Sequence, residues 1–224
     1  MNVLELKQIS KIYSKNNGDR IKAADDINLV VKKGEAIGIV GESGSGKSTL
    51  AKLIAGMIEP TSGQILFNGE VISQYSRKAL KSYYAKMQMV FQNPLDTFSP
   101  KMKISSYLIQ PMLNHGYMTK SEAFKHLSQW MMRVGLDGSY LDKYPSELSG
   151  GQLQRVVIAR ALSLNPQLVI FDECTSALDA SIQKKIIDLI VNIEHEAAFT
   201  SVFITHDLTL ACDICDRIYI MNEG

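Results

Sequence analysis

The chain contains Gly41-Glu42-Ser43-Gly44-Ser45-Gly46-Lys47-Ser48, preceded by an apolar run over 36–40. Glycines at this spacing let a loop curl until successive backbone N–H groups point inward at phosphate oxygens. A helical pattern follows the loop, with apolar residues at the spacing of one helix face: Leu50, Leu53, Ile54 and Met57. A strand, a glycine-rich loop and a helix in this order predict a nucleoside triphosphate site in an α/β fold.

The polar residues of this loop have expected roles at the phosphates. Lys47 is expected to reach the β- and γ-phosphates, and the Ser48 hydroxyl to ligate Mg²⁺. The helix that begins there adds the positive end of its dipole. The residues expected to bind the nucleotide here are Gly41, Ser43, Gly44, Ser45, Gly46, Lys47, Ser48 and Thr49.

Two carboxylates end a second apolar run. Leu168-Val169-Ile170-Phe171 predicts a buried strand, and Asp172 and Glu173 follow it directly. An acid at the carboxyl end of a parallel strand points into the crevice where ligands bind. Asp172 is expected to hold Mg²⁺ through water, and Glu173 to orient the attacking water. An acid pair at a strand end is often only solvated, but a phosphate loop in the same chain favours the functional interpretation.

Composition excludes several classes of protein. The 224 residues carry 24 Lys and Arg against 23 Asp and Glu, and this net charge of +1 argues against a strongly basic nucleic-acid binder. No apolar run approaches the about 18 residues of a membrane span, and the first residues lack the pattern of a secretory signal. Three cysteines in such a chain predict reduced thiols in the cytosol.

Short strand patterns and one long helical stretch set the expected organisation. Ile27, Leu29 and Val31 alternate with polar residues, and Asn68-Gly69 between alternating runs predicts a hairpin. The stretch 99–165 shows little strand pattern, and strand and helix patterns alternate again after it. The expected fold class is an α/β P-loop NTPase core with a mostly parallel sheet, an N-terminal antiparallel β portion and an inserted helical subdomain at about 95–165.

A third motif separates the classes of phosphate-loop protein. Small GTPases carry an Asn-Lys-x-Asp element that reads guanine, and this chain lacks it. Leu148-Ser149-Gly150-Gly151-Gln152 instead opens a helical pattern, with Ser149 as a good N-cap and two glycines that expose backbone N–H groups. Two anion cradles in one chain make sense if each serves a different nucleotide.

With these motifs in this order, nearly the whole chain resembles the ATPase subunits of ATP-binding cassette (ABC) transporters. Tyr13 resembles the aromatic residue that stacks on adenine, and Gln92 the glutamine that touches Mg²⁺ and the γ-phosphate. Ser176-Ala177-Leu178-Asp179 is similar to the loop that crosses between subunits, and His206 to the histidine that contacts the γ-phosphate. Each residue alone is weak evidence, and their joint occurrence in order carries the resemblance.

The resemblance implies an ATPase with ATP and Mg²⁺ as cofactors, in which two nucleotide domains stack head to tail. One chain would then close over the ATP held by the other chain's Lys47, using Ser149, Gly150, Gly151, Gln152 and Asp179. The implied catalytic residues are Glu173, His206, Gln92 and Lys47, and the implied metal ligands are Ser48, Gln92 and Asp172. The same resemblance makes residues 1–224 a single nucleotide-binding domain whose C-terminus looks cut short.

The motif sequences narrow the resemblance to the oligopeptide, dipeptide and nickel importer branch. Lys47-Ser48-Thr49-Leu50 is similar to the second of two non-identical ATPases in that branch. The branch implies a non-identical second ATPase subunit, two membrane permease subunits and an extracytoplasmic solute-binding protein, with no nucleic acid. It also implies a peripheral location on the cytoplasmic face of the cell membrane. Cys174 stands where proline is usual, and Phe98-Ser99-Pro100 replaces Leu-Asn-Pro, so the choice between peptide and nickel or another metal complex stays open.

Three further expectations stay open on the sequence. A soluble ABC ATPase acting on nucleic acid or ribosomes is the alternative function, although only one phosphate loop is present and no heptads occur. The region 98–112 is expected either to dock on a permease through Met102, Ile104, Tyr107 and Leu108, or to pack these residues inside the helical lobe. Cys212 and Cys215 are expected to be small buried thiols rather than a metal or redox site.

Overall fold

The computed structural model describes residues 1–14, 20–73, 77–116 and 118–224. These residues form two compact units. The first unit contains Met1–Met89, Gln167–Glu173 and Ala198–Gly224, and the second contains Val90–Pro166 and Cys174–Ala197. The helical segment expected at 95–165 therefore falls in the second unit, which also takes in a later stretch of the chain.

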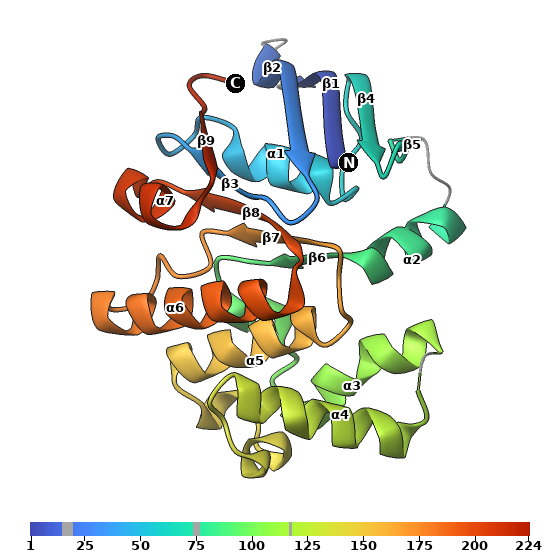
Figure 1. Ribbon diagram of the computed structural model, residues 1–224, viewed down its shortest axis with the longest axis vertical. Helices are drawn as coiled ribbons and strands as arrows, with labels where there is room; N and C mark the ends of the chain where they lie inside the picture. Colours follow the sequence, from blue (N-terminus) through green and yellow to red (C-terminus); the bar gives the residue numbers. More distant parts are fainter. Residues whose placement is uncertain (15–19, 74–76, 117) are drawn as a thin grey trace. The chain divides into compact units, whose positions relative to one another are not determined.

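The first unit is built from two sheets (Figure 1). The antiparallel sheet has the order β2-β1-β4-β5, and the other sheet has the order β6-β7-β8-β3-β9, with β3 pairing in parallel with both β8 and β9, and β7 with β8. The elements are β1 (Asn2–Ser14), β2 (Arg20–Lys32), β3 (Ala36–Val40), α1 (Lys47–Ile54), β4 (Ser62–Phe67), β5 (Glu70–Val71), α2 (Arg77–Lys86), β6 (Met87–Val90), β7 (Leu168–Asp172), β8 (Thr200–Thr205), α7 (Leu208–Ile214) and β9 (Arg217–Ile220). The α/β fold class with an N-terminal antiparallel portion is confirmed.

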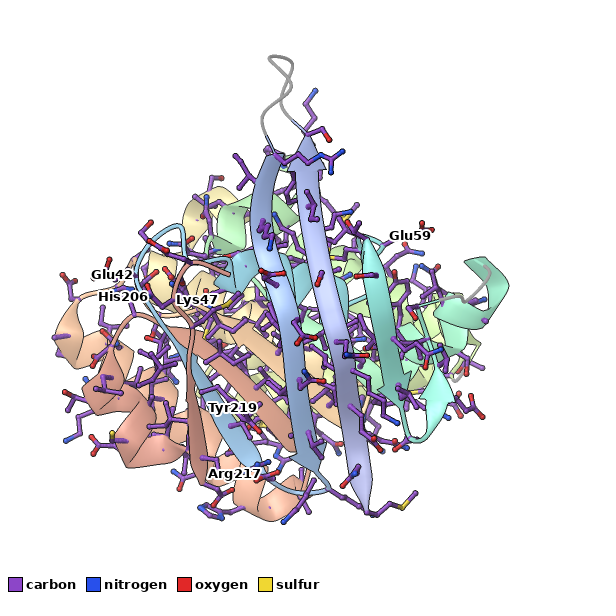
Figure 2. All side chains as sticks on the ribbon, turned by 90° about the horizontal axis from the view of Figure 1, so that it is seen from above. Glu42, Lys47, Glu59, His206, Arg217 and Tyr219 are labelled. Carbon is purple, nitrogen blue, oxygen red and sulfur yellow. The ribbon has the colours of Figure 1, made fainter. Side chains whose placement is uncertain are left out.

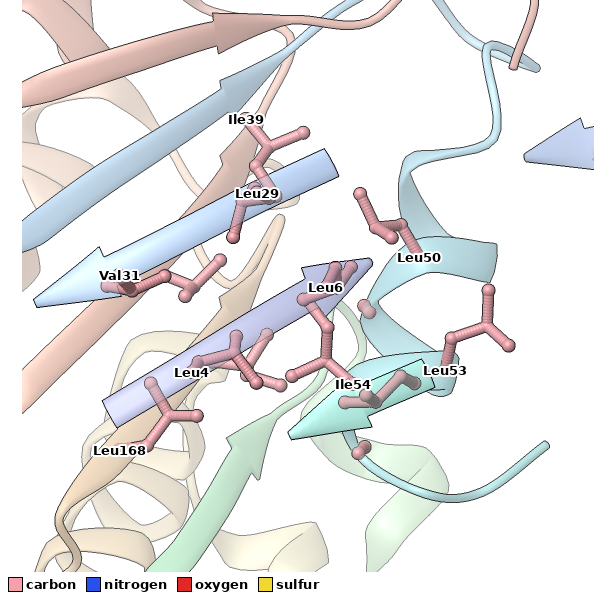
Figure 3. Close-up of a cluster of buried hydrophobic side chains, with 14 of the residues drawn as sticks. Leu4, Leu6, Leu29, Val31, Ile39, Leu50, Leu53, Ile54 and Leu168 are labelled. Atoms are coloured by element: carbon pink, nitrogen blue, oxygen red, sulfur yellow. The ribbon is translucent and has the colours of Figure 1, made fainter. Parts of the chain in front are cut away.

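One hydrophobic core joins the two sheets of this unit to α1. Leu50, Leu53 and Ile54 of α1 face apolar side chains of β1 and β2, among them Leu4 and Leu29 (Figure 3). All of these residues are at most 3% exposed. Burying each such side chain contributes about 1.5–3 kcal/mol, so the core fixes the start of α1 against the strands.

The expected hairpin is present, and the expected end of α1 is wrong. Phe67 pairs with Glu70 across Asn68-Gly69, whose φ angles of 51° and 84° suit a tight two-residue loop. Helix α1 ends at Ile54, because Gly56 at φ 65° closes it with the paired hydrogen bonds of a Schellman motif. Met57 therefore lies beyond the helix and is 52% exposed, instead of being buried on the apolar face of α1.

Strand β9 is attached to its surroundings by Arg217. The Arg217 guanidinium pairs with Glu35 and donates to the Val30 carbonyl at 2.6 Å. Although burial alone would raise the pKa of Glu35, the hydrogen bonds from Arg217 and from the Lys32 backbone hold it below its ordinary value. Figure 2 shows Arg217 and Tyr219 at one end of the strands and Lys47 at the other end. This attachment holds the start of β9, while the phosphate loop packs on Met221 just after the other end of the strand.

The two thiols near β9 differ from expectation. Cys212 is exposed and Cys215 is half-buried, so the prediction of two buried thiols is wrong. Cys215 packs against β3, where a Cβ on Gly38 would lie 3.2 Å from its sulfur. Within the described residues, no group of three or more His, Cys, Asp or Glu is placed to hold a metal ion.

The second unit is helical. Its elements are η1 (Pro94–Thr97), α3 (Ile104–His115), α4 (Lys120–Arg133), η2 (Gly138–Asp142), η3 (Pro145–Glu147), α5 (Gly150–Leu162) and α6 (Ala180–Ala197), where η denotes a 3-10 turn. Helix α4 packs on α3 and α5, and α6 packs on α5. In the described part of the chain, no helix combines the length and apolar character needed to cross a membrane.

The region 98–112 packs inside this unit. Ile104 and Leu108 are fully buried, and Tyr107 is 6% exposed. Of the four residues expected on a docking surface, Met102 alone is exposed. Of the two expected placements, packing inside the helical lobe is therefore confirmed for the other three, and exposure on a docking surface is wrong for them, because α3 packs against α4 and α5.

Candidate nucleotide-binding site

The glycine-rich loop is clamped between two other parts of the first unit. A Cβ on Gly46 would lie 2.0 Å from the Ala23 carbonyl oxygen of β2, and one on Gly41 would lie 2.2 Å from the Met221 carbonyl oxygen after β9. Gly46 also has a φ of 101°, which only glycine adopts without strain. These two glycines are therefore required by packing as well as by the approach of a phosphate.

Lys47 lies buried at the first turn of α1, with its ammonium group folded over the loop. The Lys47 Nζ donates hydrogen bonds to the carbonyl oxygens of Gly41 and Glu42, both at 2.7 Å. Figure 2 shows Lys47 beside Glu42 and His206. Gly46 is the N-cap of α1 and makes no side-chain hydrogen bond, and the first turn of α1 has no acidic residue. The N–H groups and the dipole at this end of the helix therefore suit an anion.

Ser48 and Asp172 bring two oxygen ligands together. The Ser48 hydroxyl lies 3.4 Å from Asp172 Oδ1, although 124 residues separate them in the chain. Burial, followed by the neighbouring Glu173 carboxylate, raises the pKa of Asp172 above its ordinary value. Hydroxyl and carboxylate oxygens are the ligands that Mg²⁺ prefers, so this pair fits a magnesium ion bound beside the phosphate loop.

Glu173 and His206 follow adjacent parallel strands, β7 and β8. Their side chains approach with Nδ1 of His206 3.8 Å from Oε2 of Glu173. Glu173 has a φ of 45°, and its backbone N–H donates to the Ile204 carbonyl at 2.9 Å. A left-handed conformation costs a non-glycine residue about 1–3 kcal/mol and occurs often at functional sites. The expected pair of polar residues thus lies at one carboxyl edge of the sheet.

Tyr13 lies near the end of β1, and the residue is 41% exposed. The Lys11 ammonium group lies 5.3 Å from the centre of this ring, and it also donates to the Glu59 carbonyl at 2.7 Å. An exposed aromatic ring held from one side can receive a flat base on the other. Lys11 was not anticipated from sequence, since nothing local marks a lysine two residues before a tyrosine.

The third motif caps α5 in the second unit. Ser149 Oγ accepts a hydrogen bond from the Gln152 backbone N–H at 3.4 Å, and Gln152 Oε1 accepts one from the Ser149 N–H at 2.9 Å. This reciprocal pair is a capping box, and it confirms the expected role of Ser149 as an N-cap. A Cβ on Gly151 would lie 2.8 Å from Cγ2 of Ile182 in α6. Gly151 is buried and is therefore a close-packing position between α5 and α6.

Gln92 and the loop before α6 also meet within the second unit. The Gln92 amide donates to the Ser176 hydroxyl at 3.2 Å. The Asp179 carbonyl accepts hydrogen bonds from the Ile182 and Gln183 N–H groups, both at 2.9 Å, and so starts α6. An apolar cavity of about 400 Å³ adjoins them, lined by Gln92, Leu95, Leu148, Gln154, Cys174 and Leu178 among others.

The expected site residues thus divide between the two units. The first unit brings together the phosphate loop, Asp172, Glu173 and His206, and it also carries Tyr13. The second unit holds Gln92, the motif 148–152 and Asp179. Sequence reasoning placed Ser176 in the loop 176–179 without its hydrogen bond to Gln92, and it missed Tyr140, which binds Gln152 at 3.0 Å.

Comparisons with known proteins agree on one family. A family model described as ABC transporter matches residues 24–176. The oligopeptide transport ATP-binding protein AppF of Bacillus subtilis (strain 168) is 42% identical over 230 residues, covering 99% of this chain and 70% of the relative. The oligopeptide transport ATP-binding protein OppF of the same organism is 40% identical over 224 residues, covering 99% of this chain and 73% of the relative.

Solved structures give the same result. A dimeric post-hydrolysis state of the ATP-binding cassette MJ0796, bound to ADP and Pi, has a TM-score of 0.89 at 31% identity and covers 99% of this chain and 95% of that chain. The structure of cbiO1 from Clostridium perfringens, part of the ABC transporter complex cbiONQ, has a TM-score of 0.86 at 31% identity and covers 100% of this chain and 86% of that chain.

Proposed function

This chain belongs to the ABC transporter family and is an ATPase, and from that premise we propose that it powers the import of peptides. The observation that carries the ATP chemistry is the meeting of Ser48 and Asp172, 3.4 Å apart, at the phosphate loop. The peptide substrate is supported by the relatives AppF and OppF, both oligopeptide transport ATP-binding proteins. Transport of nickel or another metal complex is the narrower alternative.

ATP would bind with its phosphates on the loop 41–48 and its adenine on Tyr13. Lys47 would exchange its bonds to the Gly41 and Glu42 carbonyls for bonds to phosphate oxygens. Ser48 and Asp172 would hold Mg²⁺, which supplies positive charge at the phosphates. Gln92, which the resemblance also implies as a ligand, belongs to the second unit.

Hydrolysis would depend on Glu173 and His206. Glu173 would accept a hydrogen bond from a water, aligning its oxygen in line with the γ-phosphorus. That oxygen bonds to phosphorus while the bond to the bridging oxygen breaks, ADP keeps the electron pair, and the water passes one proton to Glu173. The exposed His206 side chain, beside Glu173, would donate to a γ-phosphate oxygen.

The second unit would complete a site in another subunit. Ser149, Gly150 and Gly151 lie at the start of α5, where Ser149 and Gly150 are exposed and the helix dipole favours an anion. We therefore propose a head-to-tail pair with a second ATPase subunit, non-identical in the assembled transporter, in which these residues and Asp179 close over the partner's ATP. The dimeric state of the MJ0796 cassette supports this arrangement.

Two permease subunits and an extracytoplasmic solute-binding protein would complete the transporter, with this chain on the cytoplasmic face of the membrane. The apolar cavity beside Gln92 would receive a segment of one permease subunit. Leu95 lines this cavity and is 55% exposed, so a cysteine placed there should cross-link to a permease loop. A soluble ATPase acting on nucleic acid or ribosomes is not favoured, since the relatives named above serve oligopeptide transport.

Peptide uptake by living cells tests this function. Cells with Lys47→Ala in place of the natural chain should lose uptake of a labelled oligopeptide, while Lys33→Ala, which changes an exposed lysine, should leave it unchanged. Accumulation of nickel should be the same in all three strains. Normal peptide uptake in the Lys47→Ala strain, together with lost nickel accumulation, would replace peptide by metal as the substrate.

A further inference from the structure

Tyr140 holds one end of the Gln152 side chain. The Tyr140 hydroxyl oxygen accepts a hydrogen bond from Gln152 Nε2 at 3.0 Å, while Gln152 Oε1 accepts from the Ser149 backbone N–H at 2.9 Å. A backbone N–H can only donate, so the amide must turn its oxygen to Ser149 and its nitrogen to Tyr140. Both ends of this amide are therefore engaged inside the chain.

The turn that carries Tyr140 is itself well held. Asp137 Oδ1 accepts from the Ser139 backbone N–H at 2.8 Å, and Leu141 is 1% exposed. Hydrogen bonds from the side chain and backbone of Ser139 lower the pKa of Asp137, so this cap is ionised at neutral pH. The Lys143 ammonium group lies 4.0 Å from the centre of the Tyr140 ring. The phenol oxygen is thus a fixed acceptor rather than a mobile surface group.

We propose that Tyr140 is a positioning residue for ATP hydrolysis, acting through Gln152 on Ser149. By fixing the amide, Tyr140 holds the capping box that sets the direction of the Ser149 hydroxyl and of the N–H groups at the start of α5. Gln152 then serves its own subunit as a brace instead of contacting the partner's nucleotide. This inference rests on the proposed function, in which Ser149 closes over ATP bound to the partner subunit.

The hydroxyl of Tyr140 can be removed without removing its ring. Tyr140→Phe leaves the ring under Lys143 in place and takes away the acceptor for Gln152 Nε2. The amide can then rotate. Because one hydrogen bond is lost, the ATP concentration needed to close the pair should rise about two- to tenfold. Binding of ATP to Lys47 of the same chain does not involve this bond.

The test is steady-state ATP hydrolysis by the ATPase pair that the full chain forms. Tyr140→Phe should raise KM for ATP about two- to tenfold with kcat within about twofold of the natural protein. ATP affinity of the isolated chain should be unchanged. The matched control is Tyr84→Phe, which removes a half-buried hydroxyl bonded to the Gly56 carbonyl at 3.3 Å and should leave KM unchanged.

Coupling to Gln152 provides the second readout. In a Gln152→Ala background, Tyr140→Phe should have no further effect on KM, because its only route of action is already lost. An unchanged KM in the single variant, an equal rise in Tyr84→Phe, or full additivity with Gln152→Ala would overturn the inference. Ser149→Ala is measured in parallel: if it leaves KM and kcat unchanged, the shared ATP site fails, whereas a normal Tyr140→Phe beside an impaired Ser149→Ala refutes only the role of Tyr140.

Discussion

The Ser48 hydroxyl lies 3.4 Å from the Asp172 carboxylate, so two oxygens suited to Mg²⁺ are adjacent. Asp172 is 7% exposed, and its burial, together with the charge of Glu173, raises its pKa. The protein thus holds an acid at a position where ionisation is unfavourable unless a cation is present. The buried Asp172 carboxylate should therefore lower the free energy of unfolding by a measurable amount.

Asp172→Asn should stabilise the protein in the absence of Mg²⁺ and nucleotide. Between the ordinary Asp pKa of about 4 and the raised one, the folded state binds more protons than the unfolded state. The free energy of unfolding of the natural protein therefore falls as pH rises through this window and stays lower above it. Asparagine carries no such cost, so thermal unfolding should show a higher Tm for the variant at pH 7 and a converging Tm below about pH 4.

The same substitution should remove the response to Mg²⁺ with ATP. Ligand that binds only the folded state raises Tm with concentration, and the natural protein should show this rise. Asp172→Asn should show a smaller rise with Mg²⁺–ATP than the natural protein and a similar one with ATP in EDTA. A lower Tm of the variant at pH 7 without ligands would contradict the assigned cost of burial.

Gly46→Ala should cost more than Gly44→Ala, although both glycines have positive φ. Alanine at either position lowers the free energy of unfolding by about 1–2 kcal/mol, because the left-handed conformation strains it. At Gly46 the added Cβ also meets the Ala23 carbonyl oxygen at 2.0 Å, whereas at Gly44 nothing lies within 4 Å. Urea unfolding should therefore show an additional loss of at least about 1 kcal/mol for Gly46→Ala, with a loss of ATP affinity. Equal losses would show that the clamp on the loop is not rigid.

Gly151→Ala should be rescued by Ile182→Ala. The new methyl group would press on Cγ2 of Ile182 at 2.8 Å, which strains the contact between α5 and α6. Shortening Ile182 relieves that contact, so a double-mutant cycle by urea unfolding should give a favourable coupling of about 0.5–3 kcal/mol. Strict additivity would mean that Ile182 moves away at no cost.

Local patterns predicted much of this fold. The strand 36–40, the Asn68-Gly69 turn and the N-cap at Ser149 each depend on residues close together in the chain, and all three are present. The end of α1 was misplaced because hydrophobic periodicity continues to Met57 while Gly56 stops the helix. Burial of Ile104, Tyr107 and Leu108 depends on how α3 packs on other helices, and apolar residues mixed with lysines do not reveal it.

For the candidate site too, the sequence predicted some features and not others. Motif spacing identified the phosphate loop and the acid pair, since a parallel sheet brings strand ends to one edge. The meeting of Ser48 and Asp172 agrees with the expectation that both residues bind one Mg²⁺. The Lys11 contact with Tyr13 and the brace from Tyr140 to Gln152 are conformational facts. Sequence alone carries no signal for them, because neither partner of each pair has an unusual neighbour in the chain.

ATP turnover by Glu173→Gln tests the central claim most directly. Glutamine keeps the size of the side chain and removes the carboxylate that accepts from the attacking water, so kcat should fall at least about 100-fold. The Kd for ATP should stay within about twofold of the natural value, since Lys47 and the loop are unchanged. Turnover equal to that of the natural protein, measured on the same preparation that binds ATP normally, would contradict the account.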